Sequence, residues 1–197
     1  MLVLPALFDE ANKLRRLTAA VMRRLDVAGI ASALPDLPGC NESRQPLEAQ
    51  TLDHWRHAAL AAAAHFGATH VLTLRGGALI APPGMPGWAY APVAGRQVLR
   101  AMLRARTIAA REAGREESTD VLQQQARAEG IELAGWKLGA AMFSQLAEAA
   151  PSPEAAQLAI DQSAVGGSGL WLRAEPDEDS AQADALAARL SLGVATA

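Results

Sequence analysis

The chain has 197 residues, of which 50% are hydrophobic and 4% aromatic, and its formal net charge is −3. This length suits one ordinary domain with a proper core, so we expect a single domain over residues 1–197. Nucleic-acid-binding domains are typically basic, whereas this chain has a net negative charge, so we expect no nucleic-acid partner.

The cysteine count and the hydropathy pattern bear on where the protein works. Cys40 is the one cysteine, which rules out a disulfide within the chain and fits a reducing compartment. The first residues form no basic and apolar leader, and no window reaches the roughly 18 uninterrupted apolar residues of a membrane span. We therefore expect a cytoplasmic protein without a membrane span. A homo-oligomer is left open.

Up to residue 74, short apolar segments alternate with amphipathic ones. The pattern predicts strands at 1–5, 30–34 and 69–74. It also predicts a helix from Asp9, as its capping residue, to about residue 28, and a second helix that follows Thr51 and ends at Gly67. Strands and helices that alternate with short connections predict parallel strands joined by right-handed crossovers.

The pattern changes after Ile80. A loop is predicted at 81–88, and helices are predicted at about 95–114, 118–128 and 138–149, with a turn at 132–136. This block has no strand pattern, so we expect a helical insertion at about 95–149. Beyond it, segments 157–162 and 170–173 predict two strands paired in a hairpin, and 178–190 predicts a last amphipathic helix.

The segment 69–80 is the most informative part of the chain. It predicts a buried strand, a tight turn at Arg75-Gly76-Gly77 and the start of a helix. This is the shape of the nucleophile elbow of α/β-hydrolases, whose pattern is G-x-S-x-G. With Gly77 aligned on the last glycine, Arg75 takes the place of the serine. Arginine cannot attack an ester, because its guanidinium stays protonated and offers no lone pair.

Three segments, in this order and spacing, resemble one family. They are LPALFDEANKLRR at 4–16, DLPGCNES at 36–43 and LTLRGGA at 72–78. The chain resembles the second type of exosortase-system-associated hydrolase, a group of bacterial α/β-hydrolase-like proteins found beside exosortase and exopolysaccharide genes. Segments 91–96 and 133–138 also match. The resemblance implies a truncated α/β-hydrolase-like fold, in which helices flank a mostly parallel sheet and a helical cap is inserted at about 95–149.

The predicted elbow and its neighbouring loops offer an anion site. Arg75 and the amides after it could bind a phosphate or carboxylate at the start of a helix. Alternatively, Arg75 could pair with Glu10 or Asp36 and hold the loops together, and we place this structural pairing slightly ahead. The candidates for binding a small anionic ligand are Arg75, Gly76, Gly77, Glu10, Asn12, Lys13 and Asp36.

Other reactive side chains form no recognisable site. Cys40 is a weak candidate nucleophile, because no histidine is visibly placed to lower its pKa. His54 and His57 share a helix face, but Asp53 is the one evident partner, so we predict no metal site and no cofactor. The arginines at 96, 100 and 104 share another helix face. That face could meet an anion, but a solvated surface is the simpler interpretation.

Two functions compete. A hydrolase triad runs serine, acid, histidine along the chain, but here all four histidines precede the elbow: His54, His57, His65 and His70. We therefore favour a degenerate hydrolase that serves as a binding or assembly protein in exopolysaccharide or exosortase biology, a setting implied by the resemblance. The alternative is an esterase-like hydrolase that uses a different nucleophile, such as Cys40. Whether the chain is an enzyme is left open.

Overall fold

A parallel four-stranded sheet lies at the centre of the protein, in a computed structural model that describes residues 1–152 and 156–196. Each strand pairs in parallel with the next one across the sheet. The strands follow in the order β1 (Leu2–Leu4), β2 (Val71–Leu74), β3 (Gly87–Tyr90) and β6 (Gln157–Ile160).

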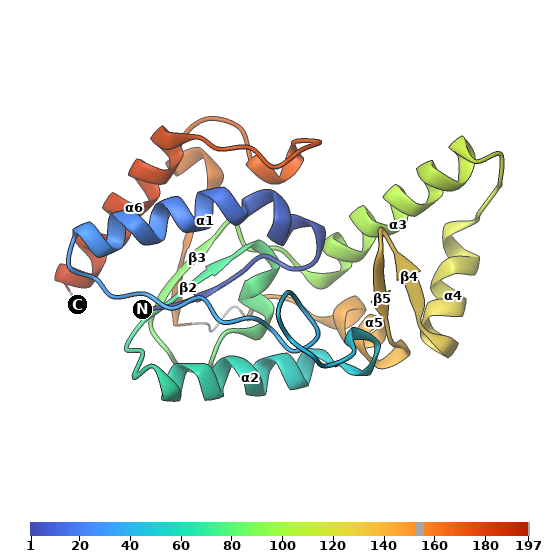
Figure 1. The fold of residues 1–197 in the computed structure, drawn as a ribbon, viewed down its shortest axis with the longest axis horizontal. Helices are drawn as coiled ribbons and strands as arrows, with labels where there is room; N and C mark the ends of the chain where they lie inside the picture. The colour runs from blue at the N-terminus through green and yellow to red at the C-terminus, as the bar shows by residue number, and fades with distance from the viewer. Residues whose placement is uncertain (153–155, 197) are drawn as a thin grey trace.

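Helices cover both faces of this sheet (Figure 1). The helices α1 (Asp9–Val27) and α6 (Ser180–Ala195) lie on one face, and α2 (Leu52–His65) lies on the other. Successive side chains of a strand point to opposite faces, so Val3 packs into the core beneath α1, whereas Leu2 and Leu4 pack towards α2. A mostly parallel sheet flanked by helices is therefore confirmed.

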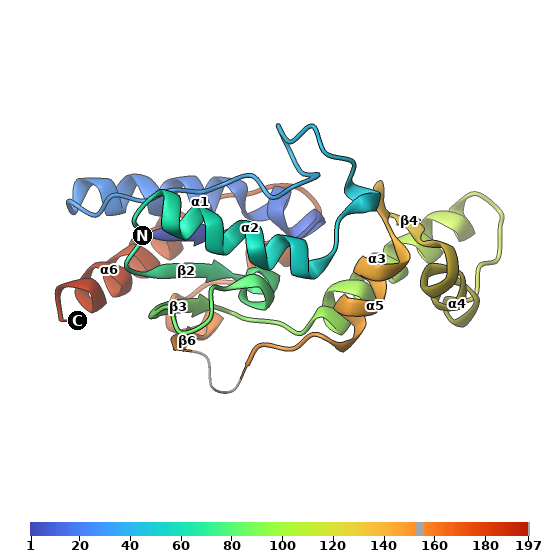
Figure 2. The same ribbon diagram turned by 90° about the horizontal axis from the view of Figure 1, so that it is seen from below.

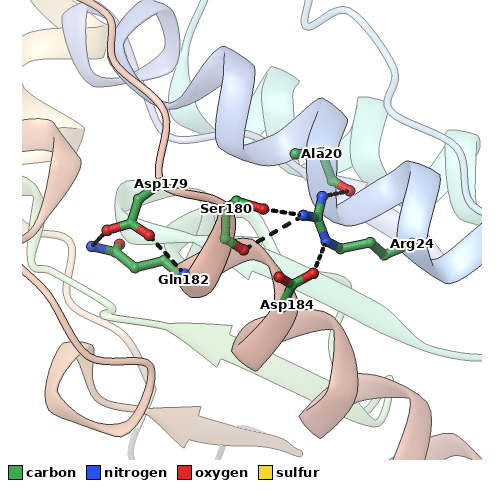
Figure 3. Close-up of polar contacts among 6 residues, drawn as sticks. All are labelled: Ala20, Arg24, Asp179, Ser180, Gln182 and Asp184. Carbon is green, nitrogen blue, oxygen red and sulfur yellow. Dashed lines mark hydrogen bonds and ion pairs between the residues drawn. The ribbon is translucent and has the colours of Figure 1, made fainter.

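Polar contacts fasten α6 to α1 (Figure 3). The guanidinium of Arg24, on α1, donates to the carboxylate of Asp184 and to Ser180 Oγ at 2.8 Å. At the start of α6, the carboxylate of Asp179 accepts a hydrogen bond of 3.0 Å from the backbone N–H of Gln182. This cap satisfies an N–H that the helix itself leaves unpaired.

The segment between β3 and β6 lies at one end of the molecule, past the carboxyl ends of the strands (Figures 1 and 2). Its helices lie close to their predicted positions. It also holds an antiparallel hairpin, so the prediction of a block without strands was wrong. The elements are α3 (Gly95–Glu112), α4 (Thr119–Glu129), β4 (Ile131–Leu133), β5 (Trp136–Leu138) and α5 (Ala140–Glu148).

The hairpin is centred on the turn expected at 132–136. Ala134 and Gly135 both have positive φ, 49° and 81°, as the tight turns of two-residue hairpins require. Because each strand is only three residues long, the alternation that marks a strand is too brief to read in the sequence.

The predicted strand at 30–34 is reduced to a single bridge between Ala33 and Leu2, so this prediction was wrong. The N–H of Ile30 closes α1 by donating to the carbonyl of Leu25 at 2.8 Å. Pro35, at the other end, has no N–H to donate. Too few backbone groups therefore remain between residues 30 and 35 to form a ladder of hydrogen bonds with β1.

Two further predictions were also wrong. Residues 87–90, of which 87 and 88 were placed in the loop at 81–88, form β3. A Cβ on Gly87 would lie 1.9 Å from the carbonyl oxygen of Val71, so this glycine lets β2 and β3 pair. Residues 170–172 form a short 3-10 helix, and β6 pairs in parallel with β3, so no hairpin joins 157–162 to 170–173.

The remaining 3-10 turns are short, and they connect the larger elements. They lie at Leu47–Ala49, Arg75–Ile80 and Gln162–Ala164. Among the helices of the described residues, none has the length and apolar character needed to span a membrane.

Candidate functional site

Three residues with strained backbones gather at the carboxyl edge of the sheet. Arg75 directly follows β2 and Ala91 directly follows β3, with φ of 51° and 45°, and Phe8 lies four residues beyond β1 with φ of 55°. Positive φ is uncommon for residues other than glycine, and such strain concentrates at functional sites. The edge where open α/β sheets form their crevice is therefore the first place to look for a site.

The turn after β2 is as tight as predicted. A 3-10 helix begins at once with Arg75 and runs to Ile80, so a helix follows the strand, although it is not an α-helix. A Cβ on Gly77 would lie 2.5 Å from the carbonyl oxygen of Pro5, and one on Gly76 would lie 3.0 Å from the Leu7 side chain. Glycine at 77 is what allows this turn to lie against the end of β1.

The Arg75 side chain is held on several sides. Its Nε and Nη2 donate to the two carboxylate oxygens of Glu10 at 3.1 and 3.0 Å, and its Nη1 donates to the carbonyl of Ala91 at 3.0 Å. The guanidinium carbon lies 4.0 Å from the centroid of the Trp171 ring. The side chains of Arg75 and Glu10 are 13% and 16% exposed. The predicted pairing of Arg75 with Glu10 is thus present.

Asp36, the other predicted partner of Arg75, is engaged elsewhere. Its carboxylate accepts hydrogen bonds from Asn41 Nδ2 at 2.8 Å and from the backbone N–H of Glu42 at 3.4 Å, and so shapes its own loop. That Arg75, Gly76 and Gly77 bind an anion stays a prediction. Such an anion would have to compete with Glu10, because three of the five N–H donors of arginine are already occupied.

The other predicted anion-binding residues, on and near the first turn of α1, do not line one common hollow. Asp9 is the first residue of the helix, and the capping position belongs to Phe8, so the predicted cap was wrong. Asp9 instead pairs with Lys13 at 2.9 Å. Glu10 and Lys13 line a hollow of about 150 Å³ with Trp171, whereas Asn12 and Asp36 line a separate hollow of about 90 Å³.

Cys40 has the electrostatics of an inert thiol. Burial, together with the Asp36 carboxylate, raises the pKa of the Cys40 thiol to about 11. It borders a hollow of only about 30 Å³, and no histidine is among the described residues that line it. The nearby hydroxyl of Ser43 accepts from the Gly39 N–H at 2.9 Å, which is a turn contact.

The histidines lie away from the elbow. His70 precedes β2, at the amino end of the sheet, and stacks on Trp88 with 5.7 Å between ring centroids. His54 and His57 are exposed on α2, and their neighbour Asp53 pairs with Arg56 at 2.8 Å. Over residues 1–152 and 156–196, no cluster of three or more histidine, cysteine or carboxylate side chains could hold a metal ion.

The sequence interpretation missed two residues that complete the surroundings of Arg75. Trp171 was expected in a strand, but it lies on a 3-10 turn, from which its ring reaches the guanidinium and packs edge-on against Tyr90, at 6.0 Å between centroids. Ala91 contributes only its backbone carbonyl. The carbonyl has no sequence signal, and Trp171 would have stood out only as one of few aromatics in the chain.

The sequence matches no protein-family model, and comparison with curated proteins also gives no match. The resemblance to the exosortase-associated hydrolases therefore stands on its motifs alone.

Proposed function

We propose that this protein is a degenerate α/β-hydrolase-like protein that works by binding or assembly, in the exopolysaccharide or exosortase setting that its motifs imply. The observation that carries the proposal is the Arg75–Glu10 pair. At the position that the motif alignment assigns to the nucleophile, Arg75 has a guanidinium that forms two hydrogen bonds to one carboxylate and packs against an aromatic ring. A residue held in this way stabilises loops and has no means of attacking a carbonyl.

Electrostatics also disfavour the alternative, an esterase that uses Cys40. A thiol with a pKa of about 11 is almost entirely protonated at neutral pH, and the thiolate is the nucleophilic form. Activation would need a nearby base, and the described residues around Cys40 include no histidine.

Hydrolysis of p-nitrophenyl acetate and butyrate at pH 7 to 9 tests the proposal. We expect purified protein to release nitrophenol no faster than buffer does, and Cys40→Ser and Ser43→Ala to behave like wild type. Rapid hydrolysis that Cys40→Ser abolishes would establish the alternative. Rapid hydrolysis lost in Ser43→Ala would show that the elbow has been misidentified as the site.

A further inference from the structure

A basic groove lies between α3, α4 and α5, away from the elbow. Its volume is about 410 Å³, compared with about 150 Å³ for the hollow beside Glu10. This lies within the roughly 300–1,000 Å³ typical of sites for small molecules. Size alone identifies no ligand, so the chemistry of the lining decides what the groove could hold.

Four arginines border the groove. Arg96, Arg100 and Arg104 are successive members of one face of α3, spaced about 6 Å apart along the helix axis, and Arg127 comes from α4. All four are exposed. Within the described part of the chain, no carboxylate lines the groove, and the side chains of Arg96, Arg100 and Arg104 form no ion pair or hydrogen bond.

The fourth arginine has only a weak partner. Arg127 lies 3.9 Å from the carboxylate of Glu148, whose side chain is 83% exposed. Exposed pairs of this kind contribute little, because water screens them and both long side chains lose freedom. In a chain whose net charge is −3, three unpaired arginines and one weakly paired arginine form a basic group that an added anion would balance.

The floor of the groove is apolar. Leu99, Leu103 and Phe143 line it and belong to the core, and the guanidinium carbon of Arg127 lies 6.0 Å from the centroid of the Phe143 ring. Phe143 is only 1% exposed and is the one aromatic among the described lining residues, so it offers no platform for stacking bases. This argues against single-stranded nucleic acid as the occupant.

We propose that the groove binds an elongated small molecule whose apolar body lies on the leucine floor and whose phosphate or carboxylate groups meet the arginines. Every cation of the groove is an arginine, and its planar guanidinium donates in pairs to oxyanions, which a lysine cannot do. Eight residues separate Arg96 from Arg104, or about 12 Å along the helix, so the groove suits two anionic groups at about that separation.

Isothermal titration calorimetry with an eight-carbon chain that carries a phosphate at each end tests this, at low ionic strength. Monooctyl phosphate lacks the second anion, and inorganic phosphate lacks the apolar body. The eight-carbon diol keeps the apolar body and lacks both charged groups. The eight-carbon dicarboxylate distinguishes carboxylate from phosphate ligands. We expect the bisphosphate or the dicarboxylate to bind at least tenfold more tightly than inorganic phosphate and than the diol.

Variants locate the binding. Arg100→Gln should weaken the preferred probe at least tenfold. Arg111→Gln, on the same helix but outside the groove, should leave binding unchanged. Glu148→Gln should tighten binding, because it frees Arg127 from its competing carboxylate. Thermal melts of all three variants, which alter exposed side chains, check that each is folded.

Equal affinity in wild type and Arg100→Gln would overturn the assignment, as would tighter binding of a single-stranded oligonucleotide. This inference rests on the proposed binding function, for which the groove would be the ligand site. The two proposals can nevertheless be refuted separately. Esterase activity would refute the function and leave Arg100-dependent binding intact, whereas binding that is independent of Arg100 would refute the groove and leave the absence of esterase activity intact.

Discussion

Replacing Arg75 by alanine should destabilise the protein by about 3 kcal/mol. The change removes both hydrogen bonds to Glu10, the one to the Ala91 carbonyl and the packing on Trp171. Breaking a buried ion pair from one side typically costs about 3–5 kcal/mol, because the remaining charge is left desolvated. Since Arg75 and Glu10 are still 13% and 16% exposed, we place the loss at the lower end of that range.

Two companion variants separate the contributions. Arg75→Gly loses the same contacts but relieves the positive φ of 51°, so it should be about 1 kcal/mol more stable than Arg75→Ala. Glu10→Ala, alone and combined with Arg75→Ala, completes a double-mutant cycle. We expect a coupling free energy of about 1.5–3 kcal/mol, within the usual range for residues in direct contact.

Urea denaturation and thermal melts, with and without phosphate, are the measurements. If Arg75 serves the fold, phosphate should not change the difference in melting temperature between wild type and Arg75→Ala. If Arg75 binds an anion, the variant should melt like wild type without phosphate and lose only the stabilisation that phosphate gives. A coupling free energy under about 0.5 kcal/mol would refute the reasoning, because the two side chains would then not depend on each other.

Three further outcomes are expected. Gly77→Ala should lower the free energy of unfolding by about 1–3 kcal/mol, more than Gly76→Ala does, because its Cβ meets the rigid Pro5 carbonyl and the other meets a movable side chain; equal melting temperatures would contradict this. Alkylation of Cys40 by iodoacetamide should speed up as pH rises, with a midpoint at about pH 11 in the folded protein and about 8.5 in urea; a folded-state midpoint at about 8.5 would be inconsistent with the buried thiol. Thr73→Val should raise the free energy of unfolding by about 1 kcal/mol in urea, because the buried hydroxyl has no partner among the described residues; a loss of stability would argue against an unpaired hydroxyl.

The elements β1, α1, α2 and β2 could be predicted because their signals are local. A short apolar segment and the amphipathic segment after it place β1 and α1 within a few residues, and the Arg75-Gly76-Gly77 turn has a sequence pattern of its own. The short strands could not be predicted in this way. β3, for example, is four residues long in a proline- and glycine-rich stretch, and it becomes a strand only because β2 and β6 lie on either side of it.

The candidate site, like the fold, could be predicted only in part. That Arg75 should meet Glu10 or Asp36 followed from these residues succeeding neighbouring predicted strands. The choice of Glu10 over Asp36 did not, because it depends on Asn41 turning the Asp36 carboxylate back into its own loop. The rest of the setting is a backbone carbonyl and the ring of Trp171, and their positions are decided by the tertiary fold.

The arginine after β2 and the arginines that border the groove differ in what surrounds them. At the elbow, one guanidinium is matched by one carboxylate, a carbonyl and an aromatic ring, so its charge is balanced within the chain. On α3, the guanidiniums of Arg96, Arg100 and Arg104 face a groove whose described lining contains no anion. A charge that the fold already neutralises stabilises the fold, whereas one left exposed over an apolar floor is available to a ligand. On this reasoning the Arg75 turn contributes to the architecture, and we propose that binding occurs among the helices between β3 and β6.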